Sequence, residues 1–245
     1  MKPLRDNVHV WYCQIQSPEA WCAVEFVLSM EEITAGQRRH DKASKTRYWL
    51  AHSCIRLLIG HYINVDPRHI SFQKNSFGKP RVVGHDISFS VSYTSNCFAI
   101  AFSKSGELGV DIEWLNPGFD FFPVATRFFG DDEIRSILCE EPTHQRRSFF
   151  EIHTLKEAYS KAQGEGLSFD RERYEFHKNP HAPQSRLCVD SEVSCINDKW
   201  SFHAVYLDLD LVASLAIDKP APVCIETFHL TQDMYSQLIK RLQEY

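Results

Sequence analysis

The chain has 245 residues, 43% of them hydrophobic, and a formal net charge of −5 at neutral pH. This length allows one large domain or two small domains with real cores, and the acidic balance without a long basic run argues against an extended nucleic-acid surface. No window holds 18 consecutive apolar residues and the N-terminal residues lack the apolar core of a secretory signal, so we expect neither a membrane span nor secretion. The eight cysteines are scattered without metal-binding spacing, which predicts reduced thiols in a cytoplasmic protein.

The first part of the chain predicts a strand, a long helix and further strands. Residues 8–15 are rich in β-forming side chains, and Ser29 with Glu32 makes a capping-box pattern that opens a short helix. Apolar residues at helical spacing predict a long helix over residues 41–62. Strands are expected over residues 69–74, 86–93, 97–103 and 108–114.

The second part of the chain predicts helices, then strands and a last helix. Acidic residues at 131–133 suit the N-terminus of a helix, and a longer helix is predicted over residues 143–163 with Gly164 as its stop. A loop is expected over residues 178–186. Strands are predicted over residues 187–193, 200–206 and 211–217, and an amphipathic helix over residues 231–243. The order predicts an α+β fold of two similar halves, residues 1–108 and residues 109–245.

Two acidic side chains occupy alternate positions on the predicted strand at residues 108–114. Asp111 and Glu113 are two residues apart, so a strand places both on one face, roughly 6.5–7 Å apart at Cα. Two like charges at this separation repel on a partly buried strand, and a hard divalent cation such as Mg²⁺ relieves that repulsion. An ordinary edge strand with two solvated acids explains the pair at least as well.

A second set of charged residues lies on the predicted helix at residues 143–163. Glu157 and Lys161 are four residues apart, which is also the spacing of a common stabilising surface pair. In a functional interpretation, Glu157 completes a cation site or takes a proton, and Lys161 lies one turn further on beside a phosphate. Lys156 points to another face, where it either reaches a phosphate or stays in water.

Basic residues also gather before and inside the first long helix. Arg38, Arg39 and Arg47, with Lys42 and Lys45, suit a single phosphate group better than a polyanion. The solvated face of a helix is an equally good explanation of the same spacing.

Taken together, these motifs resemble the signature of the surfactin-type 4′-phosphopantetheinyl transferases. Residues 109–113 (Gly-Val-Asp-Ile-Glu) are similar to the family's strand motif, and residues 153–161 (His-Thr-Leu-Lys-Glu-Ala-Tyr-Ser-Lys) to its helix motif. Residues 164–167 look like the Gly-x-Gly-Leu ending of that helix. Upstream, residues 77–80 look like the family's Gly-Lys-Pro turn, and residues 89–94 fall where it has Phe-Asn-x-Ser-His-Ser. The resemblance covers roughly residues 30–170.

The resemblance implies a fold and a set of site residues. The two α+β halves would be related by pseudo-twofold symmetry, with coenzyme A in the cleft between them. Asp111, Glu113 and Glu157 would hold Mg²⁺, or Mn²⁺, on the coenzyme A pyrophosphate. The cofactor-binding residues carried over from the family, together with those placed near its phosphates, are Arg47, Lys79, Ser92 and Tyr93, with Arg38, Arg39 and Lys156.

The implied activity is transfer of the 4′-phosphopantetheine arm of coenzyme A to a serine hydroxyl of an apo acyl or peptidyl carrier protein, with release of adenosine 3′,5′-bisphosphate. Glu157 would take the serine proton, Lys161 would offset charge on the leaving phosphate, and Asp111 would complete the catalytic set. The chain departs from the family at Tyr93, where a histidine is usual. Tyrosine donates one hydrogen bond but carries no positive charge at neutral pH, so pyrophosphate binding would be arranged differently.

Two further departures are Ser90, in place of an asparagine, and His153, in place of a tryptophan. The carrier protein, which is acidic and helical, needs an apolar groove with some positive charge at its rim. Phenylalanines at positions 119–129 with Arg127 and Arg135 are one candidate for this platform, although burial in the core is the more common place for such aromatics. Because one chain supplies both walls of the cleft, a monomer is expected.

Two other classes of function stay open at this point. A metal-dependent phosphodiesterase or nuclease also gathers acidic residues and a lysine around Mg²⁺, although the acidic balance weighs against it. A non-catalytic module that binds coenzyme A or a carrier protein would not need an intact set of carboxylates.

Overall fold

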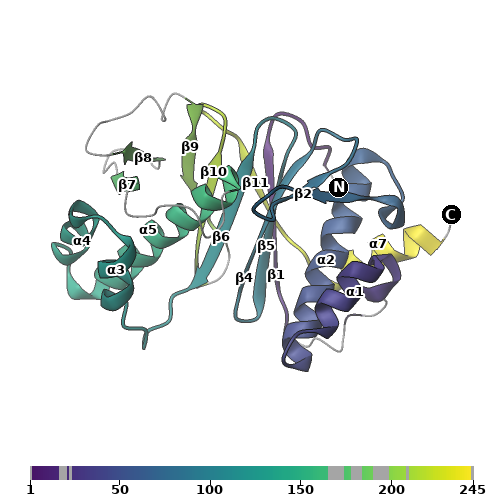
Figure 1. The fold of residues 1–245 in the computed structure, drawn as a ribbon, viewed down its shortest axis with the longest axis horizontal. Coiled ribbons are helices and arrows are strands. Elements are labelled where there is room, and N and C mark those ends of the chain that lie inside the picture. Colours follow the sequence, from purple (N-terminus) through teal and green to yellow (C-terminus); the bar gives the residue numbers. More distant parts are fainter. Residues whose placement is uncertain are drawn as a thin grey trace.

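The computed structural model describes residues 2–16, 21, 24–164, 174–177, 184–189, 199–207 and 210–243. Two β-sheets lie side by side in the centre of the molecule, and helices cover the outer face of each (Figure 1). The predicted α+β fold is confirmed. Within the described part of the chain, none of the helices has the length and apolar character needed to cross a membrane.

The first sheet has the strand order β11-β1-β5-β4. β1 (Val8–Gln14) pairs antiparallel with β5 (Cys97–Ser103), which pairs antiparallel with β4 (Ser88–Thr94), whereas β11 (Ile225–His229) runs parallel to β1. A small hairpin of β2 (Phe72–Lys74) and β3 (Pro80–Val82) lies beside it.

The helices of this half cover the outer face of the first sheet. They are α1 (Met30–Gln37), α2 (Lys42–Ile63) and α7 (Gln232–Gln243), with short 3₁₀ turns at Val24–Val27 and Pro67–His69. The capping box predicted at Ser29 and Glu32 is confirmed at the start of α1.

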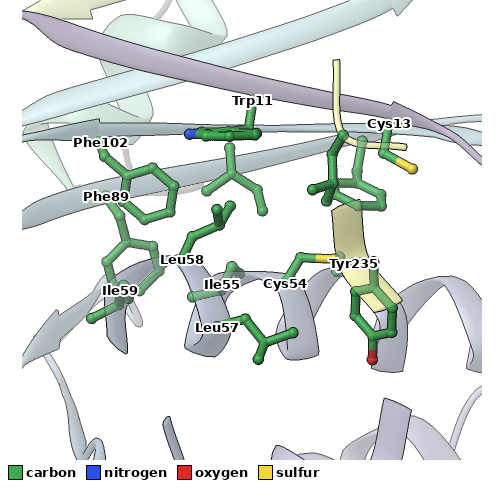
Figure 2. Close-up of a cluster of buried hydrophobic side chains, with 14 of the residues drawn as sticks. Trp11, Cys13, Cys54, Ile55, Leu57, Leu58, Ile59, Phe89, Phe102 and Tyr235 are labelled. Atoms are coloured by element: carbon green, nitrogen blue, oxygen red, sulfur yellow. The ribbon is translucent and has the colours of Figure 1, made fainter. Parts of the chain in front are cut away.

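The core of the first half lies between α2 and this sheet. Leu58 and Ile59 of α2 face Trp11 of β1 and Phe102 of β5, and Tyr235 of α7 lies beside them (Figure 2). The Tyr235 hydroxyl is 2.7 Å from the Ser53 hydroxyl of α2, so a polar contact also joins the two helices.

The second sheet has the strand order β6-β10-β9-β8-β7. Its strands are β6 (Leu108–Trp114), β7 (Tyr174–His177), β8 (Gln184–Val189), β9 (Ser201–Ala204) and β10 (Leu211–Ile217). The long helix α5 (Pro142–Gln163) lies on β6 and β10, and α3 (Phe122–Phe128) and α4 (Asp131–Leu138) extend the helical layer (Figure 1).

A buried apolar layer joins the two sheets. Alternate residues of β5 point in opposite directions, so Ile100 faces α2 whereas Ala99 and Ala101 face the second sheet. Val110 of β6 and Leu215 of β10 meet them there and are fully buried. Because both sheets contribute to this layer, β4 of the first half and β6 of the second half lie next to each other.

The division of the chain into residues 1–108 and 109–245 is wrong at its C-terminal end. β11 pairs with β1, and α7 packs on α2, so residues 225–243 complete the first half. Strand β11 was not predicted at all, because its pairing depends on a partner more than two hundred residues away.

Two local predictions also need correction. Of the strand predicted at 69–74, only residues 72–74 form a strand, because a 3₁₀ turn capped by Asp66 occupies residues 67–69. The loop predicted at 178–186 ends early, because β8 begins at Gln184; its earlier residues, and residues 190–193 of the following predicted strand, lie outside the described residues.

Candidate active site

Three predicted site residues from three different elements meet at the junction of the two halves. Asp111 Oδ1 on β6 accepts hydrogen bonds from Ser92 Oγ on β4 at 2.7 Å and from Lys161 Nζ on α5 at 2.7 Å. The lysine ammonium also donates to Ser92 Oγ at 2.8 Å. The structure therefore brings together residues that the sequence separates by 19 and 50 positions.

The second oxygen of Asp111 has a different environment. Asp111 is only 4% exposed, and its Oδ2 is buried without a hydrogen-bond partner among the described residues. A buried, unpaired carboxylate oxygen costs roughly 1–3 kcal/mol or more, so such an atom calls for an explanation. A bound hard cation would explain it, because such cations prefer carboxylate oxygens as ligands.

Glu113 lies on the same face of β6 and is also under electrostatic stress. Its Oε2 accepts a hydrogen bond from Thr94 Oγ1 at 2.9 Å. Desolvation raises the pKa of Glu113 to about 7, and repulsion from Asp111 and Glu157 adds to this rise, while Thr94 and Lys161 oppose it. Glu157 on α5 is therefore close enough to Glu113 to repel it.

These three carboxylates fit a hard divalent cation by their chemistry. The oxygens are the ligands that Mg²⁺ prefers, and positive charge between them would lower the pKa of Glu113 and satisfy Asp111 Oδ2. In the part of the chain that the structure describes, however, no group of three or more acidic, histidine or cysteine side chains has the arrangement of a metal site. Lys161 is the cation that Asp111 contacts in this structure.

A glycine explains how α5 comes so close to β6. A Cβ atom added at Gly109 would lie 2.0 Å from the Ala158 carbonyl oxygen and 2.5 Å from the Ala162 amide nitrogen. The helix backbone therefore rests directly on the strand. A hydrogen-bond contact of 2.8 Å between the hydroxyls of Thr154 and Ser214 fixes the same helix on β10. This packing aims Glu157 and Lys161 at the β6 carboxylates.

Lys156, which was predicted to bind the cofactor, is instead buried inside the second half of the molecule. Its side chain is 1% exposed and pairs with Glu133 of α4 at 2.7 Å, and its ammonium also donates to the Tyr174 carbonyl oxygen at 2.6 Å. Burial raises the pKa of Glu133, and the lysine opposes this rise. Lys156 is thus an internal link between α4, α5 and β7.

Other predicted cofactor residues lie on the side of the first half. Tyr93 is 40% exposed, and desolvation raises the pKa of its hydroxyl, with Tyr48 adding to the rise and Arg39 opposing it. The Arg39 guanidinium lies 4.7 Å from the centre of the Tyr48 ring. Arg39 therefore lies against Tyr48, and its positive charge acts on the Tyr93 hydroxyl.

The remaining basic residues have less direct relations to the Asp111 cluster. Arg47 donates to Ser44 Oγ at 3.0 Å within α2, and Arg38 is an exposed residue at the C-terminal end of α1. Lys79 lines a cavity of about 230 Å³ together with Ser90, Lys161 and Gly164, among others.

Sequence reasoning missed two features beside Glu113. Thr94 follows Ser92 by two positions on β4, so strand alternation alone could have placed its hydroxyl toward the carboxylates. A second cavity of about 560 Å³ is lined by Glu113, Trp114 and His153, among others. It lies between β6 and α5, and no local sequence pattern indicates it.

The phenylalanines of the proposed carrier platform mostly pack against the core of the second half. Phe129 is 5% exposed and stacks on Phe149 at 5.2 Å, and Phe121 stacks on the same ring at 5.3 Å. Only Phe122 keeps a large exposed fraction, 47%. For most of these phenylalanines, packing against the core is therefore a better explanation than an exposed platform for a carrier protein.

The chain is similar to several known transferases. Residues 107–216 match the model of the 4′-phosphopantetheinyl transferase superfamily. The chain is 27% identical over 219 residues to the 4′-phosphopantetheinyl transferase HetI of Nostoc sp., covering 87% of this chain and 89% of that protein. It is 32% identical over 152 residues to the 4′-phosphopantetheinyl transferase gsp of Aneurinibacillus migulanus, covering 62% of each chain.

A solved structure, the Thermotoga maritima holo-[acyl-carrier-protein] synthase, aligns with a TM-score of 0.38 and 22% identity over 47% of this chain and 64% of that chain. The chain is thus similar to members of the 4′-phosphopantetheinyl transferase superfamily. Its resemblance to the surfactin-type members is confirmed by a 26% identical relative, the transferase Sfp of Bacillus subtilis, which covers 69% of this chain and 74% of that protein.

Proposed function

We propose that the chain transfers the 4′-phosphopantetheine arm of coenzyme A to a serine hydroxyl of an apo carrier protein. Its relatives are named 4′-phosphopantetheinyl transferases, which supports this proposal. The observation that carries the proposal is the junction of β4, β6 and α5, where Asp111 has one oxygen bound by Ser92 and Lys161 and the other buried without a partner. Such a site suits an anionic substrate that arrives with a cation.

In the proposed reaction, the serine oxygen forms a bond to the β-phosphorus of coenzyme A and the pyrophosphate bond breaks. The products are the holo carrier protein and adenosine 3′,5′-bisphosphate. Asp111, Glu113 and Glu157 would hold Mg²⁺ or Mn²⁺, which when bound would neutralise charge on the pyrophosphate.

The side chains of the chain itself perform the remaining tasks. Glu157, half-buried on the cleft side of α5, takes the proton of the serine hydroxyl. Lys161 gives charge or a proton to the leaving phosphate. Ser92, which accepts from Lys161 and donates to Asp111, would turn its hydroxyl proton from Asp111 to a phosphate oxygen. Tyr93 and Arg39, with Arg38 and Arg47 as less central helpers, receive the nucleotide end.

The topology supports a finer proposal about the two halves. The strand order β1-β5-β4 of the first sheet corresponds to β6-β10-β9 of the second, and each half has a 22-residue helix, α2 or α5, on its sheet. We therefore propose that the halves are related by pseudo-twofold symmetry, and that the protein acts as a cytoplasmic monomer without nucleic acid.

The test is the intact mass of an apo acyl carrier protein after incubation with this protein, coenzyme A and Mg²⁺, with and without EDTA. We expect a gain of one phosphopantetheine arm that EDTA abolishes and that Mn²⁺ restores. Absence of any gain across several acyl and peptidyl carriers would contradict the proposed activity, and a gain that survives EDTA would contradict the metal assignment.

A further inference from the structure

The turn between β2 and β3, residues 75–79, touches the C-terminal end of α5. We propose that Lys79 is a positioning residue, which caps α5 from the first half of the molecule and does not bind coenzyme A. The inference rests on the proposed function, because α5 carries Glu157 and Lys161.

The Lys79 ammonium has an acceptor for each of its three N–H groups. It donates to Ala162 O of α5 at 2.7 Å, to Glu107 Oε2 at 2.7 Å and to Leu108 O at 3.3 Å. Its side chain is only 11% exposed. Because an ammonium has three donors, a phosphate could bind Lys79 only by breaking one of these contacts.

The backbone of the turn is built to present this lysine. Asn75 Oδ1 accepts from the backbone amides of Phe77 at 3.0 Å and Lys79 at 2.8 Å, which closes the turn on itself. The other end of the same amide, Asn75 Nδ2, donates to Gly164 O at 3.0 Å. Asn75 therefore both shapes the turn and attaches it to the helix end.

The C-terminal end of α5 needs such partners. The last carbonyl groups of a helix receive no hydrogen bond from within the helix, so they need donors from elsewhere. The helix macrodipole also favours a cation near them. Gly164 ends α5 in the left-handed conformation with φ 72°, and a Cβ there would lie 2.8 Å from Asn75 Nδ2 and 3.0 Å from Lys79 Cδ. A glycine thus lets the turn and the helix end approach each other.

The capped end of α5 is next to the reacting groups. Lys161 precedes Ala162, whose carbonyl oxygen Lys79 holds, and the Lys161 ammonium reaches Asp111 at 2.7 Å and Ser92 at 2.8 Å. Glu107 and Leu108, the other acceptors of Lys79, lie just before and at the start of β6. One side chain therefore fixes the helix end relative to the strand that carries the carboxylates.

The experiment compares Lys79→Met with Lys74→Met, an exposed lysine of the same hairpin, in the full-length protein with Mg²⁺. Calorimetry gives the dissociation constant of coenzyme A, intact mass gives the rate of arm transfer, and hydrogen exchange reports the amides of residues 158–164. For Lys79→Met we expect a dissociation constant within about twofold of the unchanged protein, turnover lower by at least about tenfold and exchange faster by about tenfold. Lys74→Met should match the unchanged protein in all three.

A second variant, Asn75→Ala, keeps the inference testable if Lys79→Met folds poorly. Asn75 caps the same helix end, so it should give the same pattern of lower turnover, faster exchange and unchanged coenzyme A binding. The inference is overturned if Lys79→Met weakens coenzyme A binding at least tenfold without faster exchange, or if Asn75→Ala changes neither turnover nor exchange. If the unchanged protein itself transfers no arm, the proposed function fails, and the exchange data alone still decide whether Lys79 holds α5.

Discussion

Replacing Gly109 with alanine tests the close packing of α5 on β6. The new methyl group would lie 2.0 Å from the Ala158 carbonyl oxygen, whereas real Cβ contacts stay beyond 3.0 Å, so the strand and helix must separate by about 1 Å. The atoms in the way belong to the helix backbone, which cannot change rotamer. The displacement therefore falls on the whole helix, including Glu157 and Lys161.

The magnitude of both effects follows from this displacement. Overpacking of a tight core costs about 1–3 kcal/mol, which for a chain of this size corresponds to a melting temperature lower by about 2–12 °C. A misplacement of about 1 Å at a catalytic group costs up to about a hundredfold in rate. We therefore expect Gly109→Ala to lose far more activity than its modest loss of stability explains.

The assay is the initial rate of carrier modification at a temperature well below unfolding, followed by intact mass, beside thermal unfolding by circular dichroism. Gly118→Ala is the matched control, because a Cβ at Gly118 meets only Asn116 Oδ1 at 3.6 Å, an ordinary contact. A Gly109→Ala protein with a rate within about twofold of the unchanged protein would refute the reasoning, since it would mean that α5 tolerates the shift.

Three further predictions concern the charged groups. Asp111→Ala should abolish transfer while circular dichroism shows an intact fold, and normal transfer by this variant would remove Asp111 from the site. Lys156→Met should lower the free energy of unfolding in urea by about 3–5 kcal/mol, because it removes the counter-charge of the buried Glu133 carboxylate, and adding Glu133→Gln should recover part of that loss. For Glu113, the folded-state pKa of about 7 exceeds its usual value of 4.5, so the folded state holds this proton more tightly. Metal-free protein should therefore lose stability as pH rises from about 4.5 to about 7, and Glu113→Gln should flatten that part of the melting-temperature profile.

Sequence patterns predicted the elements whose signals are local. The strand expected at 108–114 and the helix expected at 143–163 correspond to β6 and α5 within one residue, because alternation and helical spacing fix each without distant partners. Gly164 ends α5 as expected, because only a residue without a side chain enters the left-handed conformation easily. The pairing of Asp111 with Lys161 was not predicted, because Lys161 was expected beside a phosphate.

Local sequence patterns could not predict which distant residue pairs with a charged side chain. Lys156 and Lys161 lie on one helix five residues apart, so their different faces were foreseeable, but the buried Glu133 that receives Lys156 comes from another helix. Lys79 was assigned to coenzyme A by family resemblance, and only the fold places the end of α5 against its turn. Roles carried over by motif are weakest where a side chain has acceptors from distant elements.

The return of β11 to β1 has a consequence for how the protein is made. Val8 pairs with Ile225, so the N-terminal strand leaves the ribosome more than two hundred residues before its parallel neighbour exists. Until then, one edge of β1 presents unpaired amide and carbonyl groups, which is the state in which strands of different nascent chains join wrongly. Closure over so long a loop is slow, and the first half of the molecule can be completed only after synthesis of the second. Biogenesis of this enzyme should therefore depend on protection of that edge by chaperones during translation, more than the stability of the finished fold would suggest.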